Sequence, residues 1–254
     1  MQLLLLLLAF FLLPRTRAGE ILGGHEAKPH SRPYMAFLLI KIDTSTNRCG
    51  GLLIHEKFVL TAARCLYNSN VYSDHLKIIV LLGAHNIKKQ EKTMQVIHVK
   101  RSIPHPHYNP TVYTNDIMLL ELKEEAKLTE EVQILELPKE ETRVMPGSVC
   151  EVAGWGQLCP DGKSSDILQE VEITVQKDEK CKKHFSHYDS ATQICAGDPE
   201  FLKNVGKGDT GGPFMCNNVL QAIASYAKTN GQPLSVYTKL SPYLDWIEKT
   251  MKHH

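Results

Sequence analysis

The sequence predicts an all-β protein with a single C-terminal helix. Short segments rich in β-branched and aliphatic residues show partial alternation and are separated by turn residues, which is typical of strands. The length of 254 residues suits one unit made of two fused barrels and allows a sizeable core. The clearest predicted strands are 37–40, 76–82, 117–122, 169–175 and 219–226.

The one convincing helix lies at the C-terminus. Ser241 can cap it, and Pro242 suits its first turn. Its apolar face comprises Leu244, Ile247 and Met251. The basic tail that follows, with Lys249, Lys252 and two histidines, indicates either a solvated helix end or a glycosaminoglycan-binding patch.

The N-terminus carries an apolar run over residues 3–13 that ends near the small residue Ala18. We interpret residues 1–18 as a secretory signal peptide. The alternative is a signal anchor, but the run is shorter than the roughly 20 residues that a membrane span needs. No later segment is apolar enough to span, so we expect a secreted protein.

The charge is close to balanced, at +1 for the whole chain. Removing residues 1–20 takes away two arginines and one glutamate, which leaves the net charge at zero. This balance gives no sign of a nucleic-acid partner. Because no metal-ligand cluster, phosphate-binding loop or nucleotide motif stands out, we expect no metal and no cofactor.

Three short motifs carry the chemistry. Residues 208–213 read Gly-Asp-Thr-Gly-Gly-Pro, residues 61–65 read Thr-Ala-Ala-Arg-Cys, and residues 114–120 read Thr-Asn-Asp-Ile-Met-Leu-Leu. They resemble the nucleophile, base and carboxylate motifs of the chymotrypsin-type serine proteases, in the chain order of that family. Thr210 stands where the family has serine and Arg64 where it has histidine, whereas Asp116 is kept.

The resemblance extends over essentially the whole chain. Segments 25–36, 103–106 and 109–110 are similar to the granzyme and mast-cell protease branch, and to the granzyme B pattern in particular. This implies a trypsin-like fold of two packed six-stranded antiparallel β-barrels with a C-terminal α-helix, over residues 21–254. It also implies that Gly19-Glu20 is an activation dipeptide, whose removal frees the Ile21 ammonium to pair with buried Asp209.

Seven cysteines in a secreted chain indicate disulfides and one remaining thiol, but their spacing alone does not give the connectivity. The remaining thiol, in a turn-like segment, either links two chains in a dimer or is incidental, and we expect a monomer otherwise. The family resemblance implies the pairs Cys49–Cys65, Cys150–Cys216 and Cys181–Cys195, with Cys159 left over.

The two substitutions predict a loss of catalysis. A guanidinium stays protonated and has no acceptor lone pair, so Arg64 cannot act as the general base. It can still pair with Asp116, in a charge-assisted and even bidentate manner, as a structural replacement for histidine. Thr210 keeps a hydroxyl, but its extra methyl restricts χ1 and crowds the position of the attacked carbonyl.

The resemblance also places the binding features of the site. The oxyanion hole needs the backbone N–H groups of Gly208 and Thr210, which the loop retains. Asn204 and Ser235 would make a neutral, polar specificity pocket, and Ser225 to Ala227 form the strand beside which a substrate backbone would pair. The alternative is that these pocket residues have drifted in a site that is no longer used.

Other histidines offer a relocated base in principle. We expect His55, His98, His105 and His107 to be ordinary surface or packing residues, since none has the expected place in the motifs. The leading hypothesis is therefore a secreted, granule-type protease homologue that binds peptides, inhibitors or proteoglycans without cutting. The alternatives are a weak endopeptidase acting through Thr210, or a duplicated gene product without a selected function.

Overall fold

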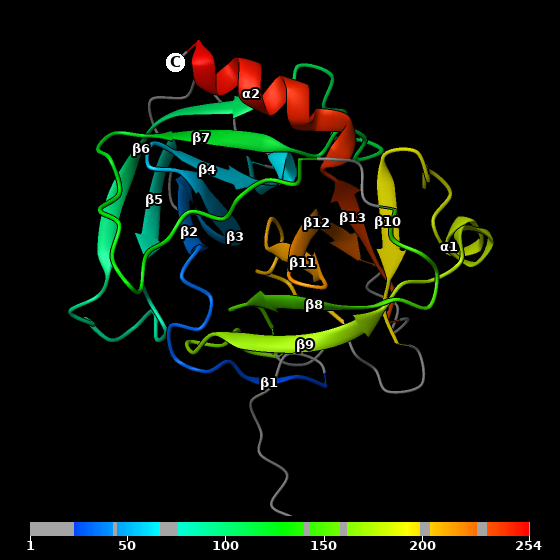
Figure 1. The fold of residues 1–254 in the computed structure, drawn as a ribbon, viewed down its shortest axis with the longest axis horizontal. Coiled ribbons are helices and arrows are strands. Elements are labelled where there is room, and N and C mark those ends of the chain that lie inside the picture. Colours follow the sequence, from blue (N-terminus) through cyan, green and yellow to red (C-terminus); the bar gives the residue numbers. More distant parts are fainter. Residues whose placement is uncertain are drawn as a thin grey trace, which may run out of the picture.

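A computed structural model describes residues 23–42, 45–66, 76–139, 143–157, 162–198, 204–227 and 233–253. Two β-structures stand side by side, and the C-terminal helix lies across one end of the first (Figure 1). The predicted signal peptide, the activation dipeptide, Ile21 and Cys159 lie outside the described residues. Within the described part, no helix is long and apolar enough to cross a membrane.

The first β-structure is a closed barrel with the strand order β2-β3-β4-β7-β6-β5. The inward side chains of β2 pack against buried residues of the neighbouring strands, because alternate residues of a strand face the same side. The barrel comprises β2 (Met35–Ile42), β3 (Ser45–His55), β4 (Phe58–Thr61), β5 (Leu76–Leu82), β6 (Gln95–Pro104) and β7 (Met118–Leu122).

The second β-structure is a seven-stranded antiparallel sheet with the order β1-β9-β8-β11-β12-β13-β10. It comprises β1 (His25–Glu26), β8 (Val149–Gly154), β9 (Gln169–Thr174), β10 (Gln193–Ala196), β11 (Pro213–Cys216), β12 (Val219–Ala227) and β13 (Ser235–Lys239). A single bridge between Val175 and Ala196 joins the ends of β9 and β10. This bridge brings β9 and β10 together, so that β8 to β13 curve into the barrel-like second half of the trypsin-like fold, and β1 pairs with β9.

The helices partly depart from the prediction. The C-terminal segment is split into the 3-10 turn η3 (Ser241–Tyr243) and α2 (Leu244–Lys252). Ser241 lies inside the turn and makes no side-chain cap bond, so its predicted capping role is wrong. Ile247 is buried, as its position on the apolar face predicted. The helix α1 (Asp178–His184) was missed, because Cys181 is its one buried residue and the rest of the segment is polar.

The three disulfides predicted from the resemblance are all present. Two of them close short loops of the chain, and the third joins the neighbouring strands β8 and β11 of the second β-structure. Together they restrict the unfolded chain more than the folded one, which is the main way disulfides stabilise a protein. The pairs are Cys49–Cys65, Cys150–Cys216 and Cys181–Cys195.

Candidate active site and substrate cleft

Asp116 lies where the sequence placed the carboxylate, just before β7. Its side chain is buried and accepts hydrogen bonds from the Arg64 backbone N–H at 2.7 Å and from the Ser225 hydroxyl. Its own backbone carbonyl accepts from the Thr238 hydroxyl at 3.0 Å. Burial raises the pKa of Asp116 to about 6, although the hydrogen bonds from Ser225 and Arg64 act in the opposite direction.

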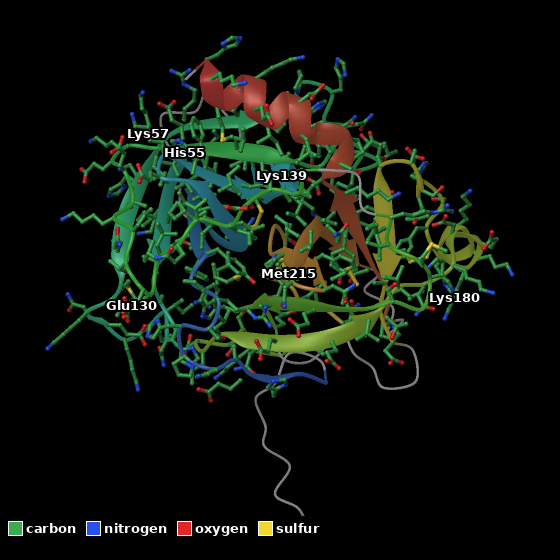
Figure 2. All side chains as sticks on the ribbon, in the orientation of Figure 1. His55, Lys57, Glu130, Lys139, Lys180 and Met215 are labelled. Atoms are coloured by element: carbon green, nitrogen blue, oxygen red, sulfur yellow. A yellow bond between two sulfur atoms is a disulfide. The ribbon has the colours of Figure 1, made fainter. Side chains whose placement is uncertain are left out.

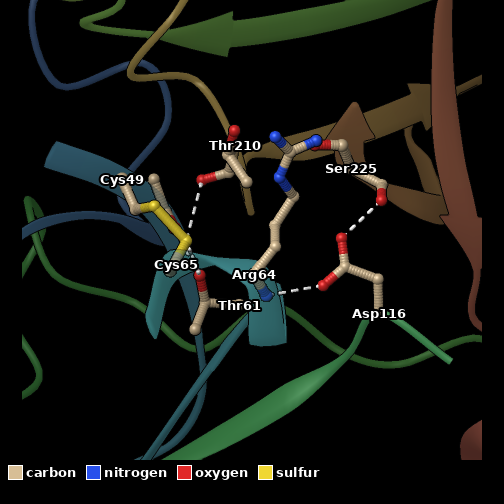
Figure 3. Close-up of a disulfide and its surroundings, with 8 residues drawn as sticks. Cys49, Thr61, Arg64, Cys65, Asp116, Thr210 and Ser225 are labelled. Atoms are coloured by element: carbon tan, nitrogen blue, oxygen red, sulfur yellow. Dashed lines mark hydrogen bonds between the residues drawn. A yellow bond between two sulfur atoms is a disulfide. The ribbon is translucent and has the colours of Figure 1, made fainter. Parts of the chain in front are cut away.

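Arg64 lies in the 3-10 turn η2 (Ala63–Leu66), which follows β4 and contains disulfide-bonded Cys65. Its guanidinium donates from Nη1 to the Ser225 carbonyl at 3.0 Å and lies 4.4 Å from the ring centroid of Tyr113. Figure 3 shows the side chain reaching past the carboxylate towards Ser225. A cation over an aromatic face at a partly exposed site contributes about 0.5–1 kcal/mol.

The predicted guanidinium–carboxylate pair between Arg64 and Asp116 is therefore wrong. Among the described residues, no ion pair involves Arg64, and its contact with Asp116 is made by the backbone N–H. The physical reason is that both carboxylate oxygens of Asp116 already accept hydrogen bonds inside the protein. The ring of Tyr113 and the carbonyl of Ser225 hold the cation instead.

Thr210 lies in the loop before β11, and its backbone carbonyl accepts from the Gly50 N–H at 2.8 Å. The Sγ atom of Cys65 is 3.8 Å from the same carbonyl, which is a packing contact because a disulfide sulfur has no proton to donate. Within the part of the chain that is described, no hydrogen bond uses the Thr210 hydroxyl. Among the described residues, none that could act as a base is therefore hydrogen-bonded to the nucleophile position.

The other histidines do not supply a base in the described structure. The Nδ1 atom of His55 accepts from the Lys57 N–H, and the two residues lie at the outer end of the first barrel, away from central Met215 (Figure 2). The His105 ring packs against Tyr243 and Trp246. Burial lowers the pKa of His105. No contact joins His98 or His107 to Thr210.

The loop from Gly206 to Gly212 is fixed mainly by its own backbone and by Asp209. The buried carboxylate of Asp209 accepts from the N–H groups of Gly156 at 2.6 Å and Gly206 at 2.8 Å. Gly211 donates to the Ala224 carbonyl at 2.7 Å, and Gly208 has a φ of +110°, which favours glycine. This backbone geometry is compatible with the predicted oxyanion role of Gly208 and Thr210.

Asp209 is a buried acid whose predicted cationic partner, Ile21, lies outside the described residues. Burial raises the pKa of Asp209 to about 6, while the hydrogen bonds from Gly206 and Gly156 act in the opposite direction. Two backbone donors therefore hold the carboxylate in place in the described structure. The insertion of the Ile21 ammonium stays a prediction.

The predicted pocket residues come together on β12, on β13 and before the Gly206–Gly212 loop. Asn204 is buried, and its side-chain oxygen accepts from the Ser235 hydroxyl and from the Val205 N–H at 2.9 Å. Ala227 pairs with Ser235 across the two strands and is exposed. These neutral polar groups satisfy each other, so the pocket base carries no charge for selecting an ionic side chain.

Two aromatic residues of the cleft escaped the sequence analysis. Tyr113 carries the Arg64 cation on its ring, and its ring centroid lies 5.3 Å from that of Tyr226. Tyr226 belongs to the strand beside which a substrate would pair. The only available signal was the position of Tyr113 three residues before Asp116, and it gave no indication of an aromatic stack.

The described residues contain no group of three or more histidine, cysteine or acidic side chains that could hold a metal ion. The arrangement that remains brings together an intact loop of backbone donors, a retained aspartate and a fixed cation. It can bind polar groups of a peptide, but none of its described residues is hydrogen-bonded to the Thr210 hydroxyl to accept its proton.

The family model for trypsin matches residues 21–247. The chain belongs to the trypsin family. It is 57% identical to human granzyme B over 255 residues, with all of both chains covered. It is 52% identical to duodenase-1 of Bos taurus, covering 99% of this chain and 97% of that protein. A solved structure titled "Structure of GrC" matches with a TM-score of 0.83 and 45% identity, over 91% of this chain and 99% of that one.

Proposed function

We propose that this trypsin-family protein is a secreted, granule-type homologue of granzymes that binds peptide segments in its cleft and does not cut them. The observation that carries the proposal is the position of the Arg64 guanidinium, on Tyr113 and the Ser225 carbonyl. A proton acceptor for the Thr210 hydroxyl is thereby replaced by a group that only donates. The names of the relatives support a granule setting.

Several features of the site are retained, and they favour a peptide-binding protein over a gene product without any function. The Gly206–Gly212 loop keeps its hydrogen bonds, and Asp116 keeps its donors although no imidazole needs orienting. The strand β12 ends in exposed Ala227, beside which a peptide backbone can pair. The partner would be a peptide segment of a protein or of a protease inhibitor. A proteoglycan is less favoured, because Lys252 of the basic tail already pairs with Glu248.

The processing expected from the sequence belongs to the same proposal. Residues 1–18 would be removed as a signal peptide, and Gly19-Glu20 as an activation dipeptide. The resulting domain, 21–254, would place the Ile21 ammonium beside Asp209. That pair would offset the cost of burying the Asp209 carboxylate.

A phosphonate probe that labels active serine proteases covalently tests the absence of catalysis. We expect the form beginning at Ile21 to stay unlabelled, and the double variant Arg64→His with Thr210→Ser to become labelled under the same conditions. Labelling of the natural protein that disappears in Thr210→Ala would favour the alternative, a weak endopeptidase that uses the threonine hydroxyl.

A further inference from the structure

We infer that Arg64 and the backbone N–H groups of Gly208 and Thr210 form a carboxylate-binding site. The ligand is a carboxylate of a peptide, presented either by its chain terminus or by an aspartate or glutamate side chain. This inference rests on the proposed function and adds the chemistry that the cleft recognises. The substitution that removes the general base would then also supply the anion receptor.

Arg64 is a fixed and only partly satisfied cation. Its own N–H is bonded to Asp116, and its guanidinium is held between the Tyr113 ring and the Ser225 carbonyl. Nη1 makes the one side-chain hydrogen bond of Arg64 to the described residues, so Nε and Nη2 keep donors for a ligand. A guanidinium held in this way loses little freedom on binding a carboxylate, with which it can form two parallel hydrogen bonds.

The loop supplies two further donors. Along it, the N–H groups of Gly206, Asp209, Gly211 and Gly212 each donate to a protein oxygen. The N–H groups of Gly208 and Thr210 make no hydrogen bond to any described residue. Backbone N–H groups that converge in a turn attract anions, and Figure 3 shows the Arg64 guanidinium and the Thr210 side chain extending in the same direction.

The two buried carboxylates of this region do not occupy the site. Asp116 is engaged by the Arg64 N–H and the Ser225 hydroxyl. Asp209 is engaged by the N–H groups of Gly156 and Gly206. The Nε and Nη2 donors of Arg64 and the two loop donors are therefore left for a ligand, while the charge of the guanidinium also lowers the pKa of Asp116. A cleaved peptide would suit them, because one carboxylate oxygen can meet the loop and the other the guanidinium.

Fluorescence anisotropy with three pools of labelled hexapeptides tests the inference on the protein beginning at Ile21. That form keeps every residue used above. The first pool lacks acidic residues and ends in a free carboxylate, the second is the same pool with an amidated C-terminus, and the third is amidated but contains one glutamate. We expect one of the two carboxylate-bearing pools to bind at least about tenfold more tightly than the neutral pool.

Arg64→Gln should reduce that preference to within about twofold, because the fork of charged donors is lost. Arg143→Gln is the matched control, since it removes the same charge from an exposed position beside a different cavity, and it should keep the preference. If Arg64→Gln fails to fold, competition on the natural protein replaces it. Acetate should then displace the bound peptide, whereas acetamide should not.

The pool that is preferred identifies the source of the carboxylate. Equal binding of all three pools, or a preference that survives in Arg64→Gln, would overturn the carboxylate site while leaving peptide binding intact. The absence of binding by any pool would overturn both the site and the peptide-binding part of the proposed function.

Discussion

The two segments that carry the substituted residues are held in different ways. The Gly206–Gly212 loop is fixed along its backbone, by the Asp209 carboxylate and by close packing around Gly211. In the turn η2, the backbone is fixed by Asp116 and the Cys49–Cys65 disulfide, whereas the Arg64 side chain contacts the Ser225 carbonyl and the Tyr113 ring. The comparison teaches that in both segments the backbone is held by contacts that do not depend on the side chains of Arg64 and Thr210.

We expect the largest loss of stability when a side chain is added to the backbone of the Gly206–Gly212 loop. In Gly211→Ala, the new Cβ would lie 2.5 Å from the Gly50 carbonyl oxygen, at a φ of +84°. We expect a loss of at least about 3 kcal/mol in the free energy of unfolding, or failure of secretion. Thermal and denaturant unfolding would measure it.

Gly147→Ala is the matched control, because its φ of +90° is equally unfavourable but nothing lies within 4 Å of the added Cβ. Its cost should be only about 1–2 kcal/mol, from the backbone conformation. Equal losses in the two variants would show that the loop is not closely packed, and would contradict the contrast with η2.

We expect a smaller change in stability when the pH alters the charge of the buried Asp209 carboxylate. Because its pKa is raised to about 6 in the folded chain, the folded state binds the proton more tightly than the unfolded state. Its contribution to stability is present at low pH and is lost as the pH rises from about 4 to about 6. We expect Asp209 to account for a loss of up to about 3 kcal/mol across this window in the full-length chain, beside the loss due to Asp116, whose pKa is also raised to about 6, and we expect a flatter profile in Asp209→Asn.

Asp245→Asn, at an exposed position of α2, should leave the profile unchanged. The form that begins at Ile21 sharpens the test. If its ammonium pairs with Asp209, the pKa of that carboxyl falls, and the Asp209 share of the loss between pH 4 and pH 6 should disappear, while the share from Asp116, whose pKa is also raised to about 6, remains. An identical profile in the two forms would contradict the predicted insertion.

We expect the smallest change in stability from a substitution of Arg64 in the turn η2. Arg64→His removes one stacked cation and one hydrogen bond, so we expect a change of only about 1–2 kcal/mol in the free energy of unfolding. The single variant should remain unlabelled by the phosphonate probe, because Thr210 is still a hindered nucleophile. A loss above about 4 kcal/mol in the free energy of unfolding would show that the Arg64 side chain is a major contributor to the stability of the fold.

Much of the fold followed from local sequence patterns. The runs 76–82 and 169–175 form β5 and β9 because their aliphatic and β-branched residues fit half-buried strands. The helix α1 could not be recognised in the same way, since its polar faces surround a single buried cysteine. The disulfide pairs came from the family resemblance, because spacing alone leaves several pairings open.

The residues of the site could be named from motifs, but their contacts could not. The orientation of Arg64 depends on Tyr113, which has a φ of 56°, and on a carbonyl of β12 that is 161 positions away in the chain. The Asp116 carboxylate is likewise occupied by Ser225, 109 positions away. Such long-range hydrogen bonds have no local pattern, so charge complementarity alone suggested a pair between Arg64 and Asp116 that the structure does not form.

The central claim is that two side chains silence an otherwise intact scaffold. The most direct test is hydrolysis of a broad peptide library by the form beginning at Ile21, run beside the double variant Arg64→His with Thr210→Ser. We predict that the double variant cuts and the natural protein does not. Removing the serine or the histidine of subtilisin, the reference case for such losses, lowers turnover by about 10⁶. Cutting by the natural protein that stops in Thr210→Ala would contradict the account.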